Sequence, residues 1–254
     1  MRRDYGTSMT SRRLLLGVLG IALLSACSLR NVACSLPSAP AEGEPAAGDL
    51  AGPTQPVRTA TVGIAFLGDS LTAGFGLLSE EAYPAVVEQL FADEGYPEVR
   101  AINAGMTGDT TAGGLRRVET LFEPDVRILV IALGGNDALR GLTTLQTRQN
   151  LTTIIDLAKA AGLDVLLAGM QAPTNLGPDY QLAFRQLYVD IAVSYGDRLE
   201  FVPFLLEGVA ANPALNQPDG IHPNAEGARV IAGLLYPRLR VLVDLHLGSG
   251  GSGE

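Results

Sequence analysis

Short apolar runs alternate with amphipathic segments along most of this 254-residue chain, and this alternation limits its fold more than any other feature. Apolar runs rich in Val, Ile, Leu and Phe predict buried strands, which we expect at 61–67, 99–103, 126–133, 164–168 and 199–202. Apolar residues at helical spacing predict helices, which we expect at 80–93, 110–122, 144–161, 180–195 and 224–243. Near-continuous apolar strands separated by helices indicate an α/β fold, with a parallel sheet that helices cover on both faces.

One folded domain accounts for most of the chain. We expect it at 59–247, a length that buries one sizeable core. Hydrophobic residues make up 47% of the sequence and charged residues 18%, which excludes a chain that is disordered overall. The formal net charge of −9 argues against a nucleic-acid partner, because binding to phosphate backbones needs a basic surface.

Cysteine and histidine are scarce, which limits the available cofactor chemistry. The two cysteines, Cys27 and Cys34, precede the expected domain, so we expect no disulfide in its core. With only two histidines, a histidine-rich metal site is excluded. We therefore expect no metal and no other cofactor. Separately, we expect the protein to be a monomer.

The N-terminal region is typical of an exported bacterial protein. Arg12 and Arg13 precede an apolar run at 14–24, which is too short to span a bilayer and suits a signal peptide. Leu-Ser-Ala-Cys, ending at Cys27, resembles a lipobox, so we expect a signal peptide at 1–27 and a lipid on Cys27. The alternative is an ordinary secretory signal that contains a cysteine. Composition predicts a flexible tether at 28–58 and a flexible tail at 248–254. The signal peptide and the lipobox-like segment predict a periplasmic or cell-envelope lipoprotein of a bacterium.

Three polar segments follow expected strands. Ser70, in Gly-Asp-Ser-Leu-Thr at 68–72, would present its hydroxyl beside free N–H groups where a helix begins, or would act as the helix N-cap. Gly105 would direct its N–H at an oxyanion or form a turn. The amide of Asn136, behind two glycines, would stabilise an oxyanion or form an Asx turn. Because ligands bind beyond the carboxyl ends of parallel strands, we expect all three residues at one site.

Asp219 and His222 form the remaining motif, within Asp-Gly-Ile-His-Pro. In a tight turn this spacing brings the carboxylate near Nδ1 of the imidazole and leaves Nε2 free to accept a proton from a serine. The alternative is a surface histidine with an acidic neighbour by chance. His246 is the other histidine, and we expect no catalytic role for it near the end of the last helix.

Together these segments resemble the sequence blocks of the SGNH (GDSL) hydrolases, and within them the bacterial lysophospholipase, arylesterase and acyl-CoA thioesterase I group. The resembling blocks lie at 68–74, 103–110, 134–141 and 219–224. The resemblance implies a flavodoxin-like three-layer α/β/α sandwich with a five-stranded parallel sheet.

The same resemblance implies a role for each candidate residue. It implies Ser70 as nucleophile, His222 as base and Asp219 as the carboxylate that orients it. It implies oxyanion donors from the backbones of Ser70 and Gly105 and from the side chain of Asn136.

The expected activity is that of a serine esterase. It would hydrolyse carboxylic (thio)esters, such as aryl esters, short- or medium-chain acyl esters or lysophospholipids, through an acyl-enzyme. Export disfavours cytosolic acyl-CoA as the natural substrate. Two alternatives remain: a carbohydrate or peptidoglycan O-acetylesterase, which uses the same residues, and a non-catalytic, surface-anchored binding module.

Overall fold

The computed structural model describes residues 61–248, which form an α/β fold around one sheet. The five strands are β1 (Val62–Gly68), β2 (Val99–Gly105), β3 (Val126–Ala132), β4 (Asp164–Ala168) and β5 (Glu200–Val202). Their order is β2-β1-β3-β4-β5, and every neighbouring pair is parallel. The predicted fold class is confirmed, and each strand lies within two residues of its predicted bounds.

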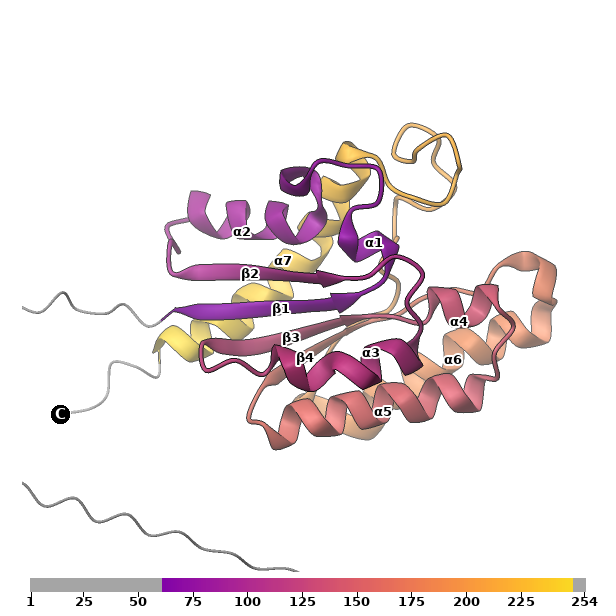
Figure 1. Cartoon of the computed structure of the whole chain (residues 1–254), viewed down its shortest axis with the longest axis horizontal. Helices are drawn as coiled ribbons and strands as arrows, with labels where there is room; N and C mark the ends of the chain where they lie inside the picture. The colour runs from indigo at the N-terminus through magenta and orange to yellow at the C-terminus, as the bar shows by residue number, and fades with distance from the viewer. Residues whose placement is uncertain (1–60, 249–254) are drawn as a thin grey trace, which may run out of the picture. The chain divides into compact units, whose positions relative to one another are not determined.

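Helices form a layer on each face of the sheet (Figure 1). On one face, α2 (Tyr83–Asp93) packs against α7 (Ala225–Gly248). On the other face, α5 (Thr144–Ala160) packs against both α3 (Thr111–Arg117) and α6 (Pro178–Tyr195). The three-layer sandwich implied by the family resemblance is therefore present.

Two predicted helices are shorter than expected, and the last is longer. The segment expected at 80–93 begins with the 3₁₀ turn Ser79–Glu81, and α2 begins only after the extended residue Ala82. The segment expected at 110–122 gives α3, which ends at Arg117, and then the 3₁₀ turn Val118–Leu121. Conversely, α7 continues to Gly248, five residues beyond the predicted end at position 243.

The sheet supplies the centre of the hydrophobic core. Every residue of β1 is buried, as is every residue of β3 except Arg127. Large side chains from the helices pack on the sheet, among them Phe91 from α2 and Phe184 from α6. Each such burial contributes roughly 1.5–3 kcal/mol, so the strand ends that carry the polar loops are firmly held.

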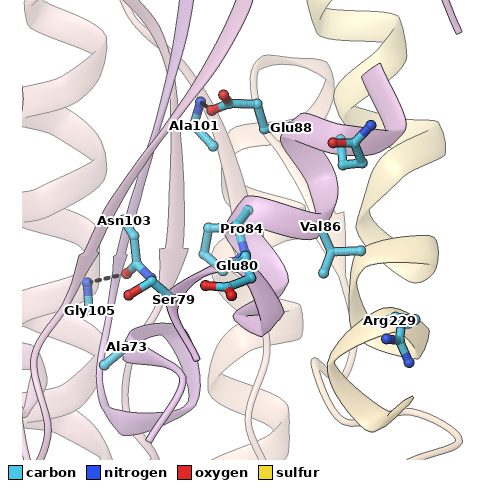
Figure 2. A pocket seen from close by; sticks show the side chains of 12 residues that line it. Ala73, Ser79, Glu80, Pro84, Val86, Glu88, Ala101, Asn103, Gly105 and Arg229 are labelled. Atoms are coloured by element: carbon cyan, nitrogen blue, oxygen red, sulfur yellow. Dashed lines mark hydrogen bonds between the residues drawn. The ribbon is translucent and has the colours of Figure 1, made fainter. Parts of the chain in front are cut away.

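One edge of the sheet is β2, and side chains of the same chain cover part of it (Figure 2). The N–H of Ala101 donates to Glu88 Oε2 of α2 at 2.6 Å, and the N–H of Gly105 donates to Asn103 Oδ1 at 3.0 Å. This edge faces a cavity of about 720 Å³ that Arg229 of α7 also lines. Two of the outward amides of β2 are thereby satisfied.

Residues 1–60 and 249–254 lie outside the described residues. The predicted signal peptide at 1–27, with Cys27, and the predicted tether at 28–58 fall in the first of these ranges. The predicted tail at 248–254 also lies outside, apart from Gly248, the last residue of α7. Within 61–248, no helix is long and apolar enough to cross a membrane.

Candidate active site

Three side chains from two distant segments meet beyond the carboxyl end of β1. Ser70 is the first residue of α1 (Ser70–Ala73), directly after β1, whereas Asp219 and His222 lie between β5 and α7. His222 Nε2 lies 3.0 Å from Ser70 Oγ, and His222 Nδ1 lies 2.7 Å from Asp219 Oδ2. The structure thus brings these three predicted residues into one chain of hydrogen bonds.

The backbone of the Asp219–His222 loop fixes the carboxylate and imidazole against each other. Asp219 Oδ1 accepts the N–H of Ile221 at 2.9 Å and the N–H of His222 at 3.0 Å, which makes an Asx-type turn. Gly220 between them has φ of 69°, a left-handed conformation that glycine adopts without strain. Because Oδ1 holds the backbone, Oδ2 remains for the imidazole.

These hydrogen bonds also set the charge of the pair. The N–H of His222, its imidazole and the N–H of Ile221 together lower the pKa of Asp219 from 3.8 to about 2. Asp219 is therefore an ionised acceptor at neutral pH, and the hydrogen between it and His222 resides on Nδ1. In the neutral imidazole, Nε2 is then an acceptor that faces the Ser70 hydroxyl.

An aromatic ring covers one face of the imidazole. The ring centroids of Phe75 and His222 are 4.7 Å apart, with the planes inclined at 38°. The His222 side chain is only 18% exposed, whereas Phe75 is 47% exposed. Phe75 therefore limits the motion of the imidazole while presenting an apolar surface beside Ser70.

Asn136 and Asp69 form a second polar pair at the site. Asn136, in α4 (Gly135–Leu139), donates through Nδ2 to Asp69 Oδ2 at 3.2 Å, and Asp69 Oδ1 accepts the N–H of Leu71 at 3.0 Å. Burial raises the pKa of Asp69 to about 6, although the N–H of Leu71 and the amide of Asn136 oppose that rise. The amide of Asn136 retains one hydrogen for another acceptor.

Gly105 is not brought to this site, which corrects the prediction that its N–H is an oxyanion donor. That N–H donates to Asn103 Oδ1 at 3.0 Å, and Gly105 lines the cavity at the β2 edge instead (Figure 2). A Cβ at Gly105 would lie 2.1 Å from the backbone nitrogen of Ala73. Glycine is therefore needed here for the close approach of β2 to α1, not for catalysis.

Gly108, three residues after Gly105, lies beside this site instead. It lines the same cavity as Ser70 and Asn136, and its φ is 79°. Its N–H has no hydrogen-bond partner in the part of the chain that the structure describes. The sequence contains one signal for Gly108, which is its place just before the start of α3. Gly108 directly precedes Asp109 and Thr110, and the Thr110 hydroxyl caps α3 by accepting the N–H of Gly113.

A cavity of about 490 Å³ adjoins Ser70 and His222. Its large side chains are mainly apolar and come from segments that follow the carboxyl ends of the strands: Phe75, Leu139, Met170, Phe204, Leu206 and Ile221. Asn136 and Gly108 supply polar groups to the same cavity as Ser70. The cavity therefore has the character of a site for an apolar group beside a reactive carbonyl.

His246 lies elsewhere. Its Nε2 is 3.0 Å from Asp164 Oδ2, and Asp164 is the first residue of β4. The amino end of β4 is the opposite end of the sheet from Ser70, so the structure keeps His246 apart from the Ser70–His222 pair.

Comparison with known proteins agrees with this geometry. The model of the GDSL-like lipase/acylhydrolase family matches residues 66–230. Esterase TesA of Pseudomonas aeruginosa is 40% identical over 178 residues, which cover 70% of this chain and 87% of that protein. Thioesterase 1/protease 1/lysophospholipase L1 of Escherichia coli is 36% identical over 179 residues, which cover 70% of this chain and 83% of that protein.

Solved structures show the same relationship. The SGNH-hydrolase family esterase AlinE4 is 41% identical, with a TM-score of 0.59 over 72% of this chain and 96% of that one. The matched family model includes Ser70, Gly108, Asn136, Asp219 and His222 within its span. The chain therefore belongs to the GDSL-like lipase/acylhydrolase family and is an SGNH-type ester hydrolase.

Proposed function

We propose that Ser70 is the nucleophile, His222 the general base and Asp219 the group that orients His222. The hydrogen-bonded chain Asp219–His222–Ser70, at 2.7 and 3.0 Å, is the observation that supports these roles most strongly. Ser70 Oγ attacks the ester carbonyl as its proton passes to His222 Nε2. Ionised Asp219 stabilises the imidazolium that results.

The remaining steps use the same groups in reverse order. His222 Nε2 returns its proton to the departing alcohol or thiol as the carbon–oxygen or carbon–sulfur bond breaks, which leaves an acyl group on Ser70. A water molecule then gives a proton to His222 and attacks the acyl carbon. Collapse of the second tetrahedral adduct releases the acid and restores the Ser70 hydroxyl.

Three donors are assigned to the oxyanion of each tetrahedral adduct: the N–H groups of Ser70 and Gly108 and the side-chain amide of Asn136. In the described part of the chain the first two have no other partner, and Asn136 has one hydrogen to spare. Losing one such donor typically slows the reaction by about 10²–10³.

The cavity supports an apolar acyl or aryl group as part of the substrate. Its volume of about 490 Å³ and its apolar side chains exceed what an acetyl group needs, which favours longer esters over acetylated sugars. Relatives named esterase, arylesterase and thioesterase/lysophospholipase point to the same substrate classes. We assign aryl esters, short- and medium-chain acyl esters and lysophospholipids to this site.

Export and anchoring belong to the proposal as well. The Arg12–Arg13 pair, the apolar run at 14–24 and the lipobox-like residues before Cys27 support a lipoprotein of the bacterial cell envelope. In that location the enzyme would meet lysophospholipids or environmental esters. Cell fractionation that finds only soluble cytosolic protein would contradict this part of the proposal.

The catalytic assignment is tested with a chain-length series of p-nitrophenyl esters. Ser70→Ala is expected to abolish ester hydrolysis and labelling by a fluorophosphonate probe. Ser79→Ala is the matched control, because Ser79 lines the cavity at the β2 edge, and this variant should retain both properties. A fluorophosphonate that labels the Ser70→Ala variant as fast as the native enzyme would overturn the role of Ser70.

A further inference from the structure

Arg117, the last residue of α3, joins three segments behind the active site. Its Nε donates to Asp109 Oδ2 at 2.8 Å, one terminal nitrogen donates to the Ala104 carbonyl at 2.7 Å, and the other donates to the Gly68 carbonyl at 2.9 Å. All three hydrogen bonds lie within the normal range. One guanidinium thus binds the ends of β1 and β2 and the loop after β2.

The segments that Arg117 holds lead directly to two proposed oxyanion donors. Gly68 ends β1 two residues before Ser70, and its carbonyl also accepts the N–H of Met106 at 3.0 Å. Asp109 directly follows Gly108. Any shift of Arg117 would therefore be transmitted to both the Ser70 amide and the Gly108 amide.

We propose that Arg117 is a positioning residue that fixes the separation between the Ser70 and Gly108 amides. The inference rests on the proposed function, in which both amides bind the oxyanion. Arg117 is not among the residues that line the cavity, and within residues 61–248 its side-chain hydrogen bonds go only to Asp109, Ala104 and Gly68. It therefore acts through other groups and is not a catalytic residue.

The requirement for arginine follows from its shape. The guanidinium presents a planar fork of donors in fixed directions, whereas lysine has a single ammonium on a flexible stem. The side chains of Arg117 and Asp109 are only 19% and 8% exposed, so water does not readily replace a lost contact. A misplacement of about 1 Å in an active site can cost on the order of 10²-fold in rate.

The test compares Arg117→Gln and Arg117→Lys with Arg116→Gln. Arg116 is the exposed neighbour on α3, so its substitution removes the same charge without breaking this cluster. We expect kcat per folded molecule to fall about 10–100-fold in Arg117→Gln and less in Arg117→Lys. Arg116→Gln should match the native enzyme. KM should stay within about twofold in all three, because the cavity is unchanged.

A second readout separates positioning from general stabilisation. A trifluoromethyl ketone forms an oxyanion adduct with the serine, so its Ki should rise in parallel with the loss of kcat. Apparent pKa values of the kcat/KM profile should not move, because Arg117 does not contact His222 or Asp219. Folded Arg117→Gln and Arg117→Lys enzymes with native kcat and native Ki would overturn the proposal. Activity that is lost in Ser70→Ala but kept in these variants would leave the proposed function intact.

Discussion

Burial of Asp69 in this fold disfavours the charged form of its carboxyl group. Asp69 directly precedes Ser70 with only 2% of its surface exposed, and burial raises its pKa to about 6. An unfolded carboxyl keeps a pKa near 3.8. The folded chain thus holds this proton more tightly, so the contribution of Asp69 to stability is complete below about pH 4 and is lost as pH rises through about 6.

Asp69→Asn should remove this pH dependence. A shift of this size corresponds to a stability change on the order of 3 kcal/mol between pH 4 and pH 7. Thermal midpoints measured across that range should therefore change less with pH in Asp69→Asn than in the native protein. Asp197→Asn, at an exposed carboxylate, is the control and should follow the native curve. Parallel curves for native protein and Asp69→Asn would contradict the prediction.

Among single residues, the sequence predicts which side chains come together more reliably than which backbone N–H groups join them. Ser70, Asp219 and His222 stand out in the sequence because few chemistries need that combination, and the structure joins them by hydrogen bonds. The sequence favours Gly105 as a donor no more than as a packing residue, because a glycine directly after a strand looks the same whether it permits close packing or frees an amide. Only the spatial position of its N–H, on Asn103 Oδ1, separates the two cases.

Among the elements, α3, α4 and α5 are joined by one buried carboxylate. Asp137 of α4 is fully buried and accepts the N–H of Thr111 at 2.8 Å. It also accepts the hydroxyls of Thr111, at 2.5 Å, and of Thr147 in α5, at 3.3 Å. Because Asp137 follows Asn136 in the short helix α4, this cluster anchors the segment that carries the Asn136 amide.

Asp137→Asn should weaken this anchor. Asparagine keeps the shape but replaces one acceptor oxygen with an NH2 group that cannot accept the threonine hydroxyls, which costs roughly 1–3 kcal/mol in the free energy of unfolding. Urea unfolding measures the loss, with Asp179→Asn, at the exposed start of α6, as the control expected to change little. A native urea midpoint for Asp137→Asn would show that the three helices do not depend on this carboxylate.

The strands and the long helices were predictable, and the very short helices were not. The long helices present apolar residues at helical spacing, and the strands follow apolar runs in the sequence. By contrast, α1 and α4 have four and five residues, too few for any period to be visible. A local cap begins α1, where Asp69 accepts the N–H of Leu71, whereas long-range contacts of Asp137 tie α4 to its neighbours.

For the whole molecule, the two sheet edges decide how readily one chain can pair with another. At one edge, β5 has only three residues, which offers little to a second strand. At the other edge, β2 is seven residues long, and Glu88 covers the Ala101 amide. The expectation that the domain is monomeric thus depends mainly on how well β2 is protected.

Glu88→Ala should expose that edge. Without the carboxylate, the outward Ala101 N–H is free to pair with a strand of another molecule, and we expect faster self-association on warming, measured by light scattering. Glu80→Ala removes the same charge from the same cavity but leaves the Ala101 contact in place, so it should behave as the native protein. Glu88→Gln retains an acceptor oxygen and should restore most of the protection. Equal self-association of Glu88→Ala and Glu80→Ala would mean that net charge, not a covered amide, keeps the edge unpaired.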